Sequence, residues 1–166
     1  MLAAYKKCYI HSKKCQLVLG NLMKSTFAER IATMNAMYKL PAHERPTVPT
    51  DVAERLQKFK STLSDEISEI DDIVSLANEG APQLDIAVAI ADLLGDVIVY
   101  CRSEALKYGL PLEEILDIIM DSNESKLGSD GKPIYDNNGK FLKGPNYWKP
   151  EPKIKKMLAI TLESHE

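Results

Sequence analysis

Apolar residues recur every three or four positions between residues 26 and 128, which is the spacing of one face of an α-helix. A Thr26…Glu29 capping box marks the start of the first helix. Thr50 or Asp51 can cap the second helix, and Gly109 ends the third. Because the connections are short, the helices should be antiparallel neighbours, and the predicted fold class is an all-α, antiparallel helical bundle. Its four helices are expected at about residues 26–39, 51–79, 83–108 and 111–123.

The sequence changes character after residue 128, where an Asn138-Gly139 pair separates the short segments PIY and KFL. This arrangement predicts a short β-hairpin as a C-terminal extension. The expected organisation has three parts. These are a basic N-terminal extension at 1–25, a helical-bundle domain at 26–127, and a hairpin with a C-terminal tail at 128–166 that packs on the same domain.

Composition narrows the class of protein without naming a function. The chain has 166 residues, of which 45% are hydrophobic and 27% charged, as is usual for one globular domain. A net charge of −3 gives no electrostatic case for binding a nucleic acid polymer. The three cysteines show no CxxC spacing, and the most apolar run, at 84–101, contains Asp92 and Asp96, which would be costly in lipid. We therefore expect a cytoplasmic protein without a membrane segment.

The second predicted helix carries an apolar stripe with two carboxylates beside it. Glu66 falls at the edge of the stripe, and Glu69 follows one turn later. Charges on the opposite side, such as Asp71, form a solvated face. An ExxE pair is common on surface helices, so this pair alone does not define a site. The stripe, which we expect to be buried, comprises Leu56, Phe59, Leu63, Ile67, Ile70, Val74 and Ala77.

The third predicted helix is apolar on all sides from Leu84 to Cys101, which predicts that it is buried on most sides. Asp85, Asp92 and Asp96 interrupt this run and form one acidic line. Carboxylates in such a place need a cation, unless they are protonated, paired with lysine or placed at the open end of the bundle.

Packing of the second helix on the third would bring Glu66 and Glu69 opposite Asp92 and Asp96. The resulting cluster has oxygen ligands and no His or Cys, which suits Mg2+, or Mn2+, better than zinc. The alternatives for the single residues stay open, because each carboxylate also has a structural explanation.

Three segments in this order resemble a known family: DEISEI, then DLLGDVIVY, then SNESKLGSDGKPIYDNNGKFLKGPNYWKP. They look like the all-α nucleoside triphosphate pyrophosphohydrolases, the superfamily of MazG, dCTP pyrophosphatase, dimeric dUTPase and phosphoribosyl-ATP pyrophosphohydrolase. The resemblance covers most of residues 27–150. The family has a glutamate three residues before the aspartate of its second motif. This chain has Leu93 there, and Asp92 stands on the same helical face as Asp96, so we interpret Asp92 as the substitute ligand.

The resemblance implies Mg2+-dependent hydrolysis of a nucleoside triphosphate between its α and β phosphates. Glu66, Glu69 and Asp96 match the catalytic carboxylates, and the metal ligands are these three with Asp92. Asn123 and Lys126 match the residues that hold phosphate, and Lys143 and Lys132 are weaker candidates for the same role.

The resemblance also implies a base pocket and an assembly. Tyr100 matches an aromatic position of relatives, and Asn35 and Tyr38 could add an amide edge and a ring, although an aromatic residue at helical spacing is more often core. Members of the family are dimers or tetramers, so we expect a homodimer or a homotetramer.

Two other functions remain open at this point. Cleavage of phosphoribosyl-ATP would use the same residues, and base selectivity depends on a pocket shape that the sequence does not define. A non-catalytic nucleotide-binding or assembly module would explain Leu93 as a mark of lost catalysis.

Overall fold

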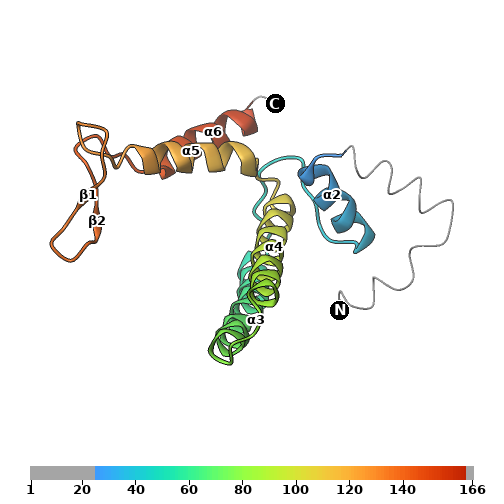
Figure 1. Cartoon of the computed structure of the whole chain (residues 1–166). Coiled ribbons are helices and arrows are strands. Elements are labelled where there is room, and N and C mark those ends of the chain that lie inside the picture. Colours follow the sequence, from blue (N-terminus) through green and yellow to red (C-terminus); the bar gives the residue numbers. More distant parts are fainter. Residues whose placement is uncertain (1–24, 164–166) are drawn as a thin grey trace. The chain divides into compact units, whose positions relative to one another are not determined.

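The computed structural model describes residues 25–163, so the predicted basic extension lies outside the described residues except for Ser25. The chain divides into two compact units, one that ends at Ala42 and one that begins at His43. The described residues form five helices and one two-stranded antiparallel sheet (Figure 1). The predicted all-α fold class with a short hairpin is therefore confirmed.

The first unit contains α2 (Phe27–Met37). As the sequence predicts, Thr26 is its N-cap, and the Thr26 hydroxyl accepts a hydrogen bond from the Glu29 backbone N–H. The Glu29 carboxylate accepts in return from the Thr26 N–H at 2.7 Å, which completes the capping box. Ile31 is buried on this helix with 3% of its surface exposed.

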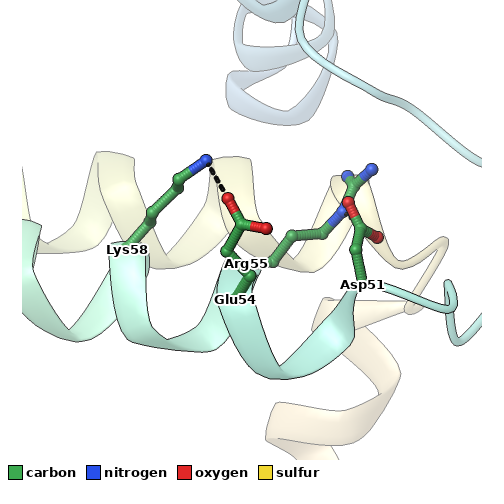
Figure 2. A network of polar contacts seen from close by, with 4 residues as sticks. All are labelled: Asp51, Glu54, Arg55 and Lys58. Carbon is green, nitrogen blue, oxygen red and sulfur yellow. Dashed lines mark hydrogen bonds and ion pairs between the residues drawn. The ribbon is translucent and has the colours of Figure 1, made fainter.

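The second unit begins with an antiparallel pair of long helices, α3 (Val52–Asn78) and α4 (Gln83–Lys107), which pack side by side (Figure 1). Gly80 turns the chain between them with a φ of 73°. Asp51 stands at the N-cap of α3, but its side chain makes no cap hydrogen bond. Its carboxylate instead accepts a hydrogen bond from Arg55 Nε at 2.7 Å. A second ion pair, between Glu54 and Lys58, lies beside it and also joins residues four positions apart (Figure 2).

The apolar stripe of α3 is less buried than the sequence predicts, because α4 packs on its edge. No residue of α3 is fully buried. Its half-buried side chains include Phe59, Thr62, Glu66 and Ile73, which at 100° per residue lie within about 60° of one another. Glu66 is therefore near the centre of the face that meets α4. The side chains left mostly exposed are Leu56, Ile67, Ile70 and Val74.

α4 is also less buried than expected, for the same reason. Leu93 is 8% exposed, and Asp96 and Tyr100, which lie within about 60° of it on the helix, are half-buried. The opposite side remains open: its exposed fractions are 73% for Leu84, 59% for Val88, 56% for Leu94 and 58% for Ile98. The expectation of burial on most sides is thus wrong for the single chain, since within the described residues α3 covers only one of two apolar faces.

The C-terminal end of α4 is fixed by an extended segment that precedes α3. The backbone N–H groups of His43 and Thr47 donate to the carbonyl oxygens of Leu106 and Tyr108. Gly109 ends α4 with a φ of 63°, as expected of a left-handed helix stop. Arg102 Nε lies 3.0 Å from a carboxylate oxygen of Glu113, which joins α4 to the next helix.

The rest of the unit consists of α5 (Leu112–Glu124), β1 (Ile134–Tyr135), β2 (Phe141–Leu142) and α6 (Glu151–Glu163). The strands pair with Tyr135 opposite Phe141, which confirms the predicted hairpin. The Asp136 carboxylate accepts hydrogen bonds from two N–H groups of the turn, those of Asn138 and Lys140.

The helix α6, which packs on α5, was not predicted from the sequence. The signal was present, because Ile154, Met157, Leu158 and Thr161 have helical spacing after Pro150. No helix among residues 25–163 combines the length and the apolar character needed to cross a membrane.

We expect Gly109→Ala to destabilise the second unit strongly. A Cβ atom at Gly109 would overlap the carbonyl oxygen of Arg45, and the positive φ adds strain. The free energy of unfolding should fall by about 3 kcal/mol, measured by urea denaturation.

The matched control is Gly80→Ala. Gly80 also has a positive φ, but a Cβ atom there would meet nothing within 4 Å. Gly80→Ala should therefore lower the free energy of unfolding by only about 1–2 kcal/mol, which is the cost of the backbone strain. Equal losses in the two variants would contradict the proposed contact between Gly109 and Arg45.

Candidate functional site

Three predicted site residues meet where α3 packs on α4. Glu66 extends from α3, and Asp96 and Tyr100 lie one turn apart on α4. All three side chains are half-buried, and the Glu66 carboxyl and the Tyr100 hydroxyl are close enough to shift each other's pKa. Glu69, which is exposed, follows Glu66 by one turn on the same helix. We call Glu66, Glu69, Asp96 and Tyr100 the acidic group.

The electrostatics of the acidic group centre on Glu66. Burial raises the pKa of its carboxyl above the ordinary value, and the charges of Glu69 and Asp96 raise it further. The polar interaction with the Tyr100 side chain acts in the opposite direction and lowers this pKa. Burial and the Glu66 charge raise the pKa of the Tyr100 hydroxyl above its ordinary value. The group therefore concentrates negative charge at a partly desolvated place.

Asp92 and Leu93 differ in their surroundings. Leu93 is buried, which is as expected if its side chain packs against α3. Asp92 is exposed, and the charges that act most strongly on Glu66 are those of Glu69, Asp96 and Asp65. The assignment of Asp92 as a substitute ligand stays a prediction.

The carboxylates do not converge on one point. Among residues 25–163, no group of three or more His, Cys, Asp or Glu side chains is arranged so that it could hold a metal ion. The chemistry of the donors still suits a hard cation, because Glu66, Glu69 and Asp96 offer only oxygen atoms and repel one another. A metal at this place therefore requires some of these side chains to change rotamer.

A second set of predicted residues lies beyond α5, in the segment 125–149, which we call the lysine loop. Lys126 Nζ donates to Asn123 Oδ1 at 2.5 Å. The Lys126 carbonyl oxygen accepts from the Gly144 N–H at 2.7 Å, which brings Lys143 next to Lys126 along the backbone. Three residues named from the sequence are thus neighbours in the structure.

The lysine loop is anchored by contacts that the sequence analysis did not find. Ser122 is buried, with 3% of its surface exposed. Its hydroxyl donates a hydrogen bond to the Trp148 carbonyl oxygen at 2.9 Å. The Trp148 N–H donates to the Ser125 hydroxyl oxygen at 3.2 Å. These residues are more than 20 positions apart, so no local pattern could have shown the contact. A Cβ atom at Gly144 would overlap the carbonyl oxygen of Leu127, which explains glycine there.

The remaining predicted residues belong to other parts of the chain. Asn35 is fully buried and Tyr38 is 58% exposed, and both belong to the unit that ends at Ala42. The hydrogen bonds and ion pairs found in residues 25–163 connect neither Asn123 nor Lys126 with Glu66 or Asp96. A hollow of about 430 Å³ lies along α6 and includes none of the predicted site residues; it is lined by Lys153, Lys156, Met157, Ile160 and Thr161.

Comparisons with known proteins give limited information. A search of solved structures finds a protein from Exiguobacterium sp. 255-15, described as a "putative NTP pyrophosphohydrolase", with 18% sequence identity and a TM-score of 0.47. The match covers 85% of this chain and 99% of that chain. No protein-family model matches the chain, and a search of curated proteins finds no match. A similarity this low does not assign a function, which has to be argued from the chain's own residues.

The raised pKa of Glu66 predicts how Glu66→Gln changes stability. The folded chain binds the proton of the Glu66 carboxyl more tightly than the unfolded chain does. The contribution of Glu66 to stability therefore falls as the pH rises from 4.5, the ordinary pKa of this carboxyl, through its higher pKa in the folded chain. Glutamine keeps the size and has no such charge. The Tm of Glu66→Gln relative to wild type should therefore be higher at about pH 7 than at about pH 4, in buffer with a chelator.

The control for loss of one negative charge is Glu114→Gln on α5, where the side chain is exposed. If the Tm difference for Glu66→Gln stays constant or shrinks as pH rises, the carboxyl of Glu66 is not disfavoured as an anion in the folded chain.

Proposed function

We propose that this chain is a Mg2+-dependent nucleoside triphosphate pyrophosphohydrolase, which hydrolyses an NTP or dNTP to the monophosphate and pyrophosphate. The observation that carries the proposal is the meeting of Glu66 and Asp96 across α3 and α4, with half-buried carboxylates whose charges act on each other. These residues come from two sequence segments that match the family's first two motifs in order. Buried carboxylates of like charge are costly to a fold, so such a pair is a candidate for chemistry.

Glu66, Glu69 and Asp96 would hold the ion, with Asp92 as the fourth ligand. Bound there, Mg2+ would neutralise phosphate oxygens and activate a water molecule. The chain's own contribution is to desolvate Glu66, which makes its carboxylate a better proton acceptor at neutral pH. One of the carboxylates would take the proton of the attacking water.

The lysine loop would hold the leaving group. Lys126 and Lys143 lie on adjacent backbone segments of this loop. Each carries a point charge suited to a phosphate oxygen. Asn123, already bonded to Lys126, fixes the direction of that lysine. Tyr100, Asn35 and Tyr38 remain candidates for contact with the base.

We expect purified protein with Mg2+ to release pyrophosphate, and not orthophosphate, from at least one member of a substrate panel. The panel holds ribo- and deoxyribonucleoside triphosphates and phosphoribosyl-ATP. Glu66→Gln and Asp96→Asn should each lower turnover by at least about tenfold, a loss of about 1.4 kcal/mol in transition-state stabilisation. Asp72→Asn, which removes an exposed charge from α3, is the matched control and should keep activity.

Other results of this assay would indicate a different function or contradict the proposal. Cleavage of phosphoribosyl-ATP alone indicates the narrower substrate, and nucleotide binding without any product indicates a non-catalytic module. Orthophosphate as sole product contradicts the proposal. Unchanged turnover of Asp92→Asn, together with higher activity of Leu93→Glu, would remove Asp92 from the site.

We also propose that the chain acts as a homodimer or homotetramer. The uncovered side of α4 presents Leu84, Val88, Leu94 and Ile98, which at 100° per residue fall within an arc of about 120°. Soluble monomers rarely expose a continuous apolar surface of this kind. A second copy is the favoured occupant, because two such helices offer each other matching apolar faces from Leu84 to Ile98.

A double variant on that face, Leu94→Glu with Ile98→Glu, should convert the assembly to monomers. Both side chains are exposed in the single chain, so the charges are tolerated by the isolated fold but not by an apolar interface. Light scattering after size exclusion measures the mass. Ile160→Glu on α6 is the control, and a wild-type mass equal to the 18.5 kDa chain would contradict the assembly.

A further inference from the structure

Nine carboxylates and no basic side chain lie between residues 61 and 101, in the part of the α3–α4 pair on either side of its connecting turn. We call these residues the acidic arm. The ion pairs found in residues 25–163 include none of these carboxylates. Carboxylates at this density repel one another, and the repulsion lowers the stability of the helix pair unless positive charge lies nearby. Seven of the nine are exposed: Asp65, Glu69, Asp71, Asp72, Glu79, Asp85 and Asp92.

The lysine loop carries the opposite charge, with five lysines and two aspartates. Both aspartates accept hydrogen bonds within the loop. Asp130 accepts from the Lys132 backbone N–H at 3.0 Å, and Asp136 accepts from two N–H groups of the hairpin turn. The ion pairs in the described part of the chain include no lysine of this loop. It therefore presents net positive charge through its exposed lysines, which are Lys132, Lys140, Lys143 and Lys149.

Apolar side chains accompany the charges on both surfaces. In the lysine loop, the two short strands leave all four of their side chains exposed, with Tyr135 at 58% and Phe141 at 39%. A two-stranded hairpin is only marginally stable in water without a further contact. On the acidic arm, Ile67, Val74 and Ile98 are exposed beside the carboxylates. The two surfaces thus match in both the sign of their charge and their apolar content.

The two surfaces are not brought together by the contacts of a single chain. Within the described residues, α3 packs on α4, and α5 packs on α6. The hydrogen bonds and ion pairs of these residues include none between the acidic arm and the lysine loop. A second copy offers both surfaces, and the assembly proposed from the uncovered side of α4 already places a second copy against this helix pair.

We propose that the lysine loop of one copy docks on the acidic arm of a second copy. A two-fold dimer makes this contact twice, because each copy supplies one loop and one arm. The contact adds complementary charge to the apolar contact of the proposed assembly. One consequence rests on the proposed function: the lysines that hold the phosphates near Glu66 then belong to the partner copy.

Reversal of charge on each surface in turn tests the docking. The loop variant combines Lys132→Glu, Lys140→Glu and Lys143→Glu. The arm variant combines Asp65→Lys, Asp71→Lys and Asp85→Lys, three exposed carboxylates outside the acidic group. Analytical ultracentrifugation measures the dissociation constant of the assembly for each variant alone and for an equimolar mixture of the two.

Each variant alone should associate about tenfold or more weakly than wild type, because like charges then face each other across the contact. The mixture should regain nearly wild-type affinity, since both contacts of the mixed dimer again join opposite charges. Wild-type association should also weaken as the salt concentration rises from about 0.1 M to about 1 M, over which the Debye length falls from about 10 Å to about 3 Å. The matched control combines Glu114→Lys, Asp117→Lys and Glu124→Lys, exposed residues of α5, and should associate as wild type does.

Three results would overturn the docking: a monomeric wild type, unchanged affinity in both variants, or a mixture that associates no better than its components. If the two sets of changes restore affinity only when combined in one chain, the contact lies within a single chain and the proposal is wrong. Circular dichroism checks folding, and should a triple variant not fold, Lys140→Glu and Asp65→Lys are mixed instead and judged by the same criterion. Restored association together with a wild type that releases no pyrophosphate leaves the docking standing and removes the proposed function. Pyrophosphate release by a monomeric wild type does the reverse.

Discussion

The packing of α3 against α4 is the contact on which the rest of the second unit depends. The side of α3 that meets α4 carries Glu66, so the acidic group forms at the interface between the two helices. An apolar residue at position 66 would pack better there, since a half-buried carboxylate loses part of its hydration. The fold therefore gives up some stability at the position where the proposed chemistry needs a charge.

Local signals in the sequence were sufficient for the helix ends, because these depend on nearby backbone groups. The capping box at Thr26 and the stop at Gly109 both form as expected. Burial was predicted poorly, because it depends on which element covers a face. The run from Leu84 to Cys101 is apolar on all sides apart from its aspartates, and periodicity does not tell whether one neighbour or several will cover it.

The candidate site was predictable to a similar extent. Spacing places Glu66 and Asp96 on faces that can meet, and their half-burial and interacting charges are consistent with such a meeting. The interaction between Glu66 and Tyr100 was not predictable, since it depends on the axial register of two helices. The anchoring of the lysine loop by Ser122 and Trp148 depends on a contact between distant residues, for which one sequence gives no signal.

The proposed substrate site and the proposed assembly would use different sides of α3. At 100° per residue, Ile67 and Val74 lie about 80–100° to one side of Glu66, whereas Glu69 lies about 60° to the other. A partner copy that covered the exposed Ile67 and Val74 would approach from the flank opposite Glu69. The exposed carboxylate of Glu69 would then remain open to solvent, and in the proposed function a triphosphate would enter from that side. One helix can thus serve an interface and a site, because its two flanks carry different chemistry.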